Sequence, residues 1–255
     1  MGSLRFYQFE TLRHPDLVHA IVTRQGGVSP EPWHSLNVGG NVGDESARVR
    51  ENLRRACVAV GRDHHSIYDV WQVHSSRVVR ANTPRSGKEL IKADVLICDD
   101  PSVTLFMRFA DCVPIFLYDP KNRAVGLAHS GWLGTARAAP VAAVQAMSEA
   151  FGTHPEDLYV GIGPAIGPDH YTVGSEVAER IRDAFGPSAE NHLQTHDGEV
   201  YLNLWSANRH LLERAGVKSI EVAELCTACH LEDWYSHRGE GRITGRFGAM
   251  VALGA

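Results

Sequence analysis

Short apolar runs alternate along this chain with longer stretches in which apolar residues recur every three or four positions. The runs predict β-strands, and the boundaries that we expect are 69–73, 93–98, 102–109, 113–119, 124–129, 157–163, 219–225 and 248–253. Several of these runs are apolar throughout, which is typical of strands with both faces buried.

The periodic stretches predict helices at 46–60, 135–151, 175–185 and 203–215. The first of them places on one face the residues Val49, Leu53, Cys57 and Val60. Asp44 stands where an N-cap residue is expected for that helix. Pro140 should either kink the second helix or mark its true first turn.

Strands and helices interleave in a way that predicts an α/β fold with a mixed β-sheet and flanking helices. The strands at 102–109, 113–119 and 124–129 follow one another closely, so we expect them to be antiparallel neighbours. No change of composition marks a domain boundary. A chain of 255 residues with 44% hydrophobic content is long enough to bury a sizeable core.

Charge and cysteine content narrow the class of protein. The net charge is −5 and no basic run or face stands out, so nothing favours a nucleic-acid partner. No segment has the length and apolar character of a signal peptide or of a membrane span. Five cysteines, an odd number, fit a reducing compartment, and we expect a cytoplasmic protein.

Candidate chemistry gathers at His74 in WQVHSS, Cys112 in FADCVPIFLYDP and His129 in VGLAHSGWLGTA. Each lies at the end of an apolar run, and strand ends that face one crevice commonly carry reactive groups in α/β folds. Two imidazoles and a thiol suit Zn²⁺, with a fourth position left for water or substrate, and they could also hold copper. The alternative is two buried histidines and an inert core cysteine.

The chain has one close cysteine pair, Cys226 and Cys229, with His230 and His237 nearby. Taken alone, this pair could be half of a structural zinc site. A second pair of that kind is missing, however, and a reducing compartment does not favour a disulfide. We therefore expect packed thiols there and not a metal site.

Polar residues in two other segments are candidates for binding and catalysis. Arg24 lies in TRQGGVS, where adjacent glycines let the backbone approach a ligand and a guanidinium suits a phosphate, although an exposed loop arginine is the alternative. Ser35 and Asn37 could hydrogen-bond a ribose or a base, or could form an ordinary turn. Asp111 directly precedes Cys112 and could orient a ligand, accept a histidine N–H, act as general base or cap a turn.

The motifs that carry a family resemblance span nearly the whole chain. They are TRQGGVS (23–29), SLNVGG (35–40), GD (43–44), ENLRRA (51–56), WQVHSSRV (71–78), ADVLIC (93–98), ADCVPIFLYDP (110–120), GLAHSGWLGTA (126–136), GIGPAIGPDHYTVG (161–174), LNLWSANRHLL (202–212) and SHRGEGRITGRFGAMVAL (236–253). In this order they resemble the laccase-domain family, also called multicopper polyphenol oxidoreductase-like and now associated with purine nucleoside phosphorylase and adenosine deaminase activity. The resemblance implies a single layered domain over residues 1–255, with His74, Cys112 and His129 as the metal ligands.

The resemblance also implies a function, that of a zinc-dependent purine nucleoside enzyme. We expect phosphorolysis of adenosine-type and inosine-type nucleosides and of methylthioadenosine, together with deamination of adenosine. The partners would be a purine nucleoside and phosphate, and the protein would be a monomer or a small homo-oligomer. The family usually reads H-A-G-W-R-G-T where this chain has Leu133 in place of the arginine. Arg24 should therefore carry more of the anion binding.

Two other functions stay open at this point. A copper oxidase acting on phenols needs a blue-copper site and a trinuclear cluster built from His-x-His pairs, and this chain contains no His-x-His. A non-enzymatic or editing role, for instance in quality control of cell-wall precursors, leaves no mark in the sequence. Turnover of purine nucleosides by the purified protein would separate these functions.

Overall fold

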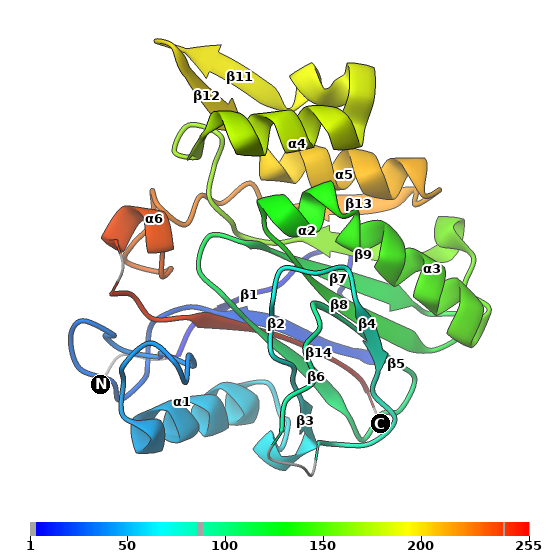
Figure 1. The fold of residues 1–255 in the computed structure, drawn as a ribbon. Coiled ribbons are helices and arrows are strands. Elements are labelled where there is room, and N and C mark those ends of the chain that lie inside the picture. The colour runs from blue at the N-terminus through cyan, green and yellow to red at the C-terminus, as the bar shows by residue number, and fades with distance from the viewer. Residues whose placement is uncertain (1–3, 86–88, 242, 255) are drawn as a thin grey trace.

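Two large β-sheets lie face to face, and helices cover the outer face of each (Figure 1). The computed structural model describes residues 4–85, 89–241 and 243–254. The α/β class and the mixed sheet that the sequence predicts are both confirmed. Among the described residues, no helix is both long and apolar enough to cross a bilayer.

The larger sheet is mixed and carries most of the candidate site. In spatial order its strands are β13 (Ser219–Val222), β9 (Tyr159–Ile162), β7 (Val113–Asp119), β8 (Ala124–Ser130), β5 (Val95–Cys98) and β4 (Val78–Arg80). The two outer pairs, β13 with β9 and β4 with β5, are parallel, and the inner pairs are antiparallel.

The second sheet is built around the strand that comes last in the sequence. Its strands, in spatial order, are β1 (Phe6–Tyr7), β2 (Leu17–Val22), β14 (Phe247–Leu253), β6 (Thr104–Phe109) and β3 (Ile67–Tyr68). β14 is antiparallel to both of its neighbours, β2 and β6. A small third sheet contains β10 (Thr172–Val173), β12 (Glu199–Leu202) and β11 (Leu193–His196).

The helices divide between the two outer faces of the sheets (Figure 1). α1 (Ser46–Ala59) packs on the second sheet, and the larger sheet is covered by α2 (Trp132–Ala136), α3 (Ala139–Phe151), α4 (Ser175–Phe185) and α5 (Leu204–Arg214). A short α6 (His237–Glu240) precedes β14, and 3₁₀ turns occupy His64–Ser66, Pro155–Asp157 and Gly186–Asn191. The helix predicted at 135–151 is thus two helices, with Pro140 in the first turn of α3.

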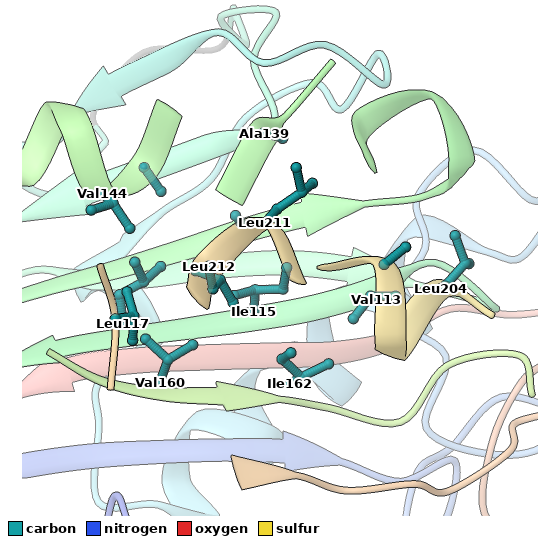
Figure 2. Packing of buried hydrophobic residues seen from close by; sticks show 14 of the residues in the cluster. Val113, Ile115, Leu117, Ala139, Val144, Val160, Ile162, Leu204, Leu211 and Leu212 are labelled. Carbon is teal, nitrogen blue, oxygen red and sulfur yellow. The ribbon is translucent and has the colours of Figure 1, made fainter. Parts of the chain in front are cut away.

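The side chains of β7 show why this strand is apolar along its whole length. Val113, Ile115 and Leu117 pack against α3 and α5, as Figure 2 shows, while Phe116 and Tyr118 point into the layer between the two sheets. Because successive side chains of a strand alternate between its faces, a strand buried on both faces needs apolar residues at nearly every position.

The expected antiparallel pairing of 113–119 with 124–129 is confirmed, but one other predicted pairing and one predicted strand are wrong. The strand at 102–109, which is β6, does not neighbour β7. It pairs with β14 and β3 in the second sheet, so the chain crosses from one sheet to the other at residues 110–112. The run at 69–73, which directly follows β3, forms no strand. Within it, Trp71 makes an isolated bridge to Lys92.

The predicted N-cap of the first helix is also wrong. Glu45 is the N-cap residue of α1, and its side chain makes no capping hydrogen bond. The carboxylate of Asp44 is used elsewhere, because it accepts hydrogen bonds from the Ser29 hydroxyl at 2.5 Å and from the Asn37 amide at 2.9 Å. The two buried donors need an acceptor, and the Asp44 carboxylate supplies it. This role explains why Asp44 does not cap the helix.

Candidate metal centre and cavity

Three segments that are distant in the sequence bring His74, Cys112 and His129 together. His129 lies in β8, Cys112 lies in the crossing between β6 and β7, and His74 lies in a loop with a positive φ of 59°. One ligand atom from each residue falls within 4.8 Å of the others, and Cys112 Sγ lies 3.9 Å from His74 Nε2. The structure thus places all three predicted metal ligands around one point.

The orientation of His129 is set by Asp94, a residue for which we predicted no role. The imidazole Nδ1 of His129 lies 2.9 Å from Asp94 Oδ1, and both side chains are buried. When Nδ1–H donates to this carboxylate, the lone pair of Nε2 is free to bind a metal. We considered Asp111 as the acceptor of a histidine N–H, but Asp94 has that role.

The same carboxylate also organises the loop that carries His74. Asp94 accepts hydrogen bonds from the backbone N–H groups of Val73, His74 and Ser75 and from the Ser75 hydroxyl, at 2.7–3.1 Å. Burial disfavours the charged carboxylate, but the partners His129 and Ser75 outweigh this effect and hold the pKa of Asp94 well below its usual range. One ionised side chain thus positions two of the three candidate ligands.

Charge favours a thiolate at Cys112. Burial disfavours the thiolate, but the neighbouring His129 and His74 outweigh it and lower the pKa of Cys112 to about 6. Burial likewise disfavours a charged His129, yet Cys112 and Asp94 together raise the pKa of His129 to about 9. A thiolate is the form of cysteine that binds metals and acts as a nucleophile.

The donor set fits a zinc ion. Bond lengths of about 2.0–2.3 Å give a tetrahedral site with edges of roughly 3.3–3.8 Å, so the three ligand atoms need only a slight approach. The close packing here depends on Gly131, because a Cβ atom at that position would lie 2.6 Å from Cys112 Sγ. Three protein ligands leave one position open, as in catalytic zinc sites.

The three residues line a cavity of about 660 Å³. Its walls include the aromatic side chains of Trp71, Trp132 and Tyr171, and the guanidinium groups of Arg108, Arg238 and Arg246. The size and the mixture of flat apolar groups with a few polar groups are typical of sites for small molecules. Leu133, which follows Trp132 on α2, is not among the residues that line it.

The structure does not bring Arg24 to this cavity. Its Nε donates to the carbonyl of His34 at 2.8 Å, and its Nη1 donates to the carbonyl of Leu231 at 2.9 Å and to Glu240 Oε1 at 2.8 Å. The guanidinium also lies 4.3 Å from the centre of the Tyr235 ring. An internal carboxylate thus takes the position beside Arg24 where the sequence predicts a phosphate.

Ser35 and Asn37 also lie outside the cavity wall. The Ser35 hydroxyl donates to the Arg24 carbonyl at 2.9 Å. Asn37 is fully buried, and its Oδ1 accepts hydrogen bonds from the backbone N–H groups of Gly39 and Arg246, both at 2.9 Å. Asn37 therefore supports the cavity indirectly, because Gly39 and Arg246 do line it.

Asp111 connects the cavity wall to C-terminal segments of the chain through hydrogen bonds. Its carboxylate accepts hydrogen bonds from Thr227 Oγ1 at 2.7 Å, Ser236 Oγ at 2.6 Å and the backbone N–H of Arg238 at 2.7 Å. Its φ of 83° is uncommon for a residue other than glycine and marks the sharp bend between β6 and β7. Both carboxylate oxygens of Asp111 are occupied by partners within the protein.

Known proteins are similar to this chain along most of its length. Residues 18–254 match the family model described as multi-copper polyphenol oxidoreductase laccase. A purine nucleoside phosphorylase of Deinococcus radiodurans is 35% identical over 244 residues, which cover 95% of this chain and 92% of that protein. The purine nucleoside phosphorylase YlmD of Geobacillus stearothermophilus is 36% identical over 92% of this chain and 89% of its own. The crystal structure of YlmD from Geobacillus stearothermophilus matches with a TM-score of 0.92 at 32% identity, covering 98% of this chain and 99% of that one.

Proposed function

The chain belongs to the multi-copper polyphenol oxidoreductase laccase family, and we propose that it is a zinc-dependent purine nucleoside phosphorylase. The substrates would be a purine nucleoside and inorganic phosphate, as the names of its relatives suggest. The observation that carries the proposal is the convergence of His74, Cys112 and His129 on the wall of a cavity. The same wall includes an arginine that has no ion-pair partner among the described residues.

That arginine is Arg246, which replaces Arg24 as our candidate for phosphate binding. Its Nη1 donates to the carbonyls of Thr244 and Gly245, and within the described part of the chain it forms no ion pair. Burial lowers the pKa of Arg246, with Cys112 and Asp111 acting against this effect. A half-buried cation without a carboxylate partner is stabilised by an anionic ligand.

The nucleoside would lie against the aromatic groups of the same cavity. Trp71, Trp132 and Tyr171 offer flat apolar surfaces on which a purine can stack. Tyr171 is itself packed beneath the guanidinium of Arg238, at 5.2 Å from its ring centre. The aromatic wall would thereby hold the base while Arg246 holds the phosphate.

In phosphorolysis the bond between the ribose C1′ and the purine nitrogen breaks, and a phosphate oxygen bonds to C1′. The electron pair stays on the purine nitrogen, and the departing base takes up one proton. Arg246 would orient the phosphate. The apolar aromatic wall of the cavity would limit the access of competing water. Zinc at His74, Cys112 and His129 would supply Lewis-acid polarisation of an oxygen atom of substrate or water.

The same site supports the finer activities that the family resemblance implies. Deamination of adenosine requires an activated water molecule and no phosphate, so it would depend on the metal ligands and not on Arg246. Methylthioadenosine is included because the wall of the cavity offers apolar surface for a thioether. A copper-dependent oxidation of phenols would use the same ligands in a different way, and the functional test separates it.

The test is turnover by protein purified without added metal and then loaded with zinc. Inosine, adenosine and methylthioadenosine are each incubated with and without phosphate, and free base, ribose 1-phosphate and deaminated product are separated by chromatography. Base release that requires phosphate supports the proposal. Oxygen uptake with phenols in the absence of base release would contradict it.

Paired arginine variants locate the phosphate. Arg246→Met should raise the KM for phosphate roughly tenfold or more, because a hydrogen bond to a charged group contributes about 1.5–3 kcal/mol. It should change adenosine deamination less. Arg24→Met is the matched control, and we expect it to lower thermal stability with little change in that KM. The reverse pattern would return the anion site to Arg24.

A further inference from the structure

A second group of potential metal ligands lies outside the residues that line the cavity. Asp169, His170, Cys226 and Cys229 each offer one ligand atom, and these four atoms all lie within 4.8 Å of one another. Two come from the segment that follows β9, and two come from the segment that follows β13. The two segments run side by side, since Ala165 and Cys226 form a parallel bridge.

Four distances within this group lie near the edge lengths of a small coordination tetrahedron. His170 Nδ1 lies 3.6 Å from Cys229 Sγ, 3.8 Å from Cys226 Sγ and 3.1 Å from Asp169 Oδ2. Cys229 Sγ lies 4.0 Å from Asp169 Oδ2. Zinc bonds of about 2.0–2.3 Å give tetrahedral edges of roughly 3.3–3.8 Å, which is close to this set.

From this arrangement we infer that Asp169, His170, Cys226 and Cys229 form a second, structural zinc site. Two thiolates with one imidazole and one carboxylate make a soft ligand set that selects zinc over magnesium or calcium. All four coordination positions come from the protein, so no position is left for substrate. A closed site of this kind stabilises structure and does not perform chemistry.

The backbone around Cys226 is shaped for a thiolate. The N–H of Gly167 donates to Cys226 Sγ at 3.2 Å, and such a bond stabilises negative charge on a ligating sulfur. Gly167 has no room for a side chain, because a Cβ atom there would lie 2.6 Å from Asp169 Oδ1 and 3.1 Å from Cys226 Cβ. The turn that carries Asp169 and His170 is thus held tightly against the cysteine loop.

This site revises the packed thiols that the sequence predicts at Cys226 and Cys229. The pair does look like half of a zinc site, and the missing half is not a second cysteine pair. It is the dipeptide Asp169–His170, which the fold of the sheet brings beside it. Spacing along the sequence could not show this, because the two halves follow different strands, β9 and β13.

A metal at this point would brace one wall of the cavity. Thr227, between the two cysteines, donates to the carboxylate of Asp111 at 2.7 Å. Tyr171 directly follows His170 and lines the cavity. Fixing both segments to one ion therefore fixes the positions of Thr227 and Tyr171, while the ion itself stays outside the reacting volume.

The test is a metal count on zinc-loaded protein after unbound zinc has been removed. We expect about two zinc ions per chain in the unmodified protein and about one in both Cys229→Ser and Cys112→Ala. The double variant should bind almost none. Cobalt loading gives a second measure. The thiolate-to-cobalt absorption that remains in Cys112→Ala comes from the second site, and most of it should be lost when Cys229→Ser is added.

Controls separate the site from a general loss of folding. His230→Gln changes an exposed histidine of the same loop whose ring faces Glu232 at 3.3 Å, and it should keep two zinc ions. His170→Gln replaces an exposed ligand and should also lose one ion if Cys229→Ser proves unstable. A zinc count that Cys229→Ser and His170→Gln leave unchanged would overturn the inference. So would a disulfide between Cys226 and Cys229 that persists in protein exposed to zinc. Because Cys112→Ala is counted separately, failure of the cavity site would not be mistaken for failure of this one.

Discussion

The two groups of cysteine and histidine residues differ in whether they leave a coordination position free for a substrate. The cavity group, His74, Cys112 and His129, supplies three ligands beside a volume of about 660 Å³. The second group offers four potential ligands, of which Cys226 is buried and the other three are exposed. If both groups bind zinc as we propose, residues of similar chemistry would serve two purposes. The number of protein ligands and the access to a cavity would distinguish the two sites.

The groups also differ in how they are supported. Asp94 is fully buried and accepts hydrogen bonds from the backbone N–H of His74 and from the ring of His129. Within the described residues, the second group has no carboxylate that plays this part, and its own Asp169 is one of the proposed ligands. A reactive centre needs its ligands held in one orientation, whereas a structural site can be shaped by the ion that it binds.

The comparison is tested most strongly by replacing one thiol of each group. Cys112→Ala should lower nucleoside phosphorolysis by more than the roughly 100-fold that loss of an outer-shell partner costs. Cys229→Ser should lower it by less than tenfold, since its ligand set lies outside the cavity. Steady-state turnover at saturating inosine and phosphate measures both. Equal losses would mean that the second group takes part in the reaction.

The next largest effect is expected at Asp94. Asp94→Asn should weaken zinc binding at the cavity group by roughly 10–100-fold, because the amide cannot stabilise the imidazole of His129 as a carboxylate does. Competition with a coloured chelator measures the affinity. Asp99→Asn, which removes an exposed partner of Arg80, is the control and should have no effect. A loss of zinc from both groups in Asp94→Asn would instead indicate a folding defect.

The smallest effect concerns thiol reactivity in chelator-treated protein. Desolvation, the Cys226 thiol and the Asp169 carboxylate raise the pKa of Cys229 to about 11, whereas the pKa of Cys112 is lowered to about 6. Near neutral pH, Cys112 is therefore largely thiolate and Cys229 largely thiol. Iodoacetamide should modify Cys112 about tenfold faster, although Cys229 is the more exposed.

The pH dependence of that reaction sharpens the same point. The rate at Cys112 should rise as the pH passes through about 6 and then level off, because its thiolate is fully formed above that value. The rate at Cys229 should still be rising at pH 9. Peptide mass spectrometry after timed alkylation follows both sites in one sample. Faster modification of Cys229 near pH 7 would contradict the assignment of charge.

Burial on both faces made the main strands readable in the sequence. The continuous apolar run of β7 was predicted with its correct ends, and so was α4, whose apolar residues recur at helical spacing. β2 was missed because His19 interrupts its pattern. That histidine is fully buried, and its Nε2 accepts the N–H of Phe9 at 3.0 Å. Which strand joins which sheet depends on pairing between distant segments, and the sequence pattern does not encode it locally.

The candidate site was predictable where a residue type implies its chemistry. His74, Cys112 and His129 stand in unusual contexts, and the structure brings them together. The anion role expected of Arg24 could not be checked from the sequence, because its carboxylate partner Glu240 lies 216 residues away. Asp94 gave no signal beyond a carboxylate placed just before an apolar run.

The order in which the strands occur along the chain has a consequence for biosynthesis. β14 (Phe247–Leu253) is the central strand of its sheet, and both β2 and β6 form their hydrogen bonds to it. While a ribosome is still making the chain, these two strands emerge long before the partner that separates them. Until residue 253 has been made, each presents an open edge of unpaired peptide groups beside apolar side chains. The nascent protein therefore spends most of its synthesis with strand edges that can pair with other chains. A chaperone that shields such edges would raise the yield of native protein.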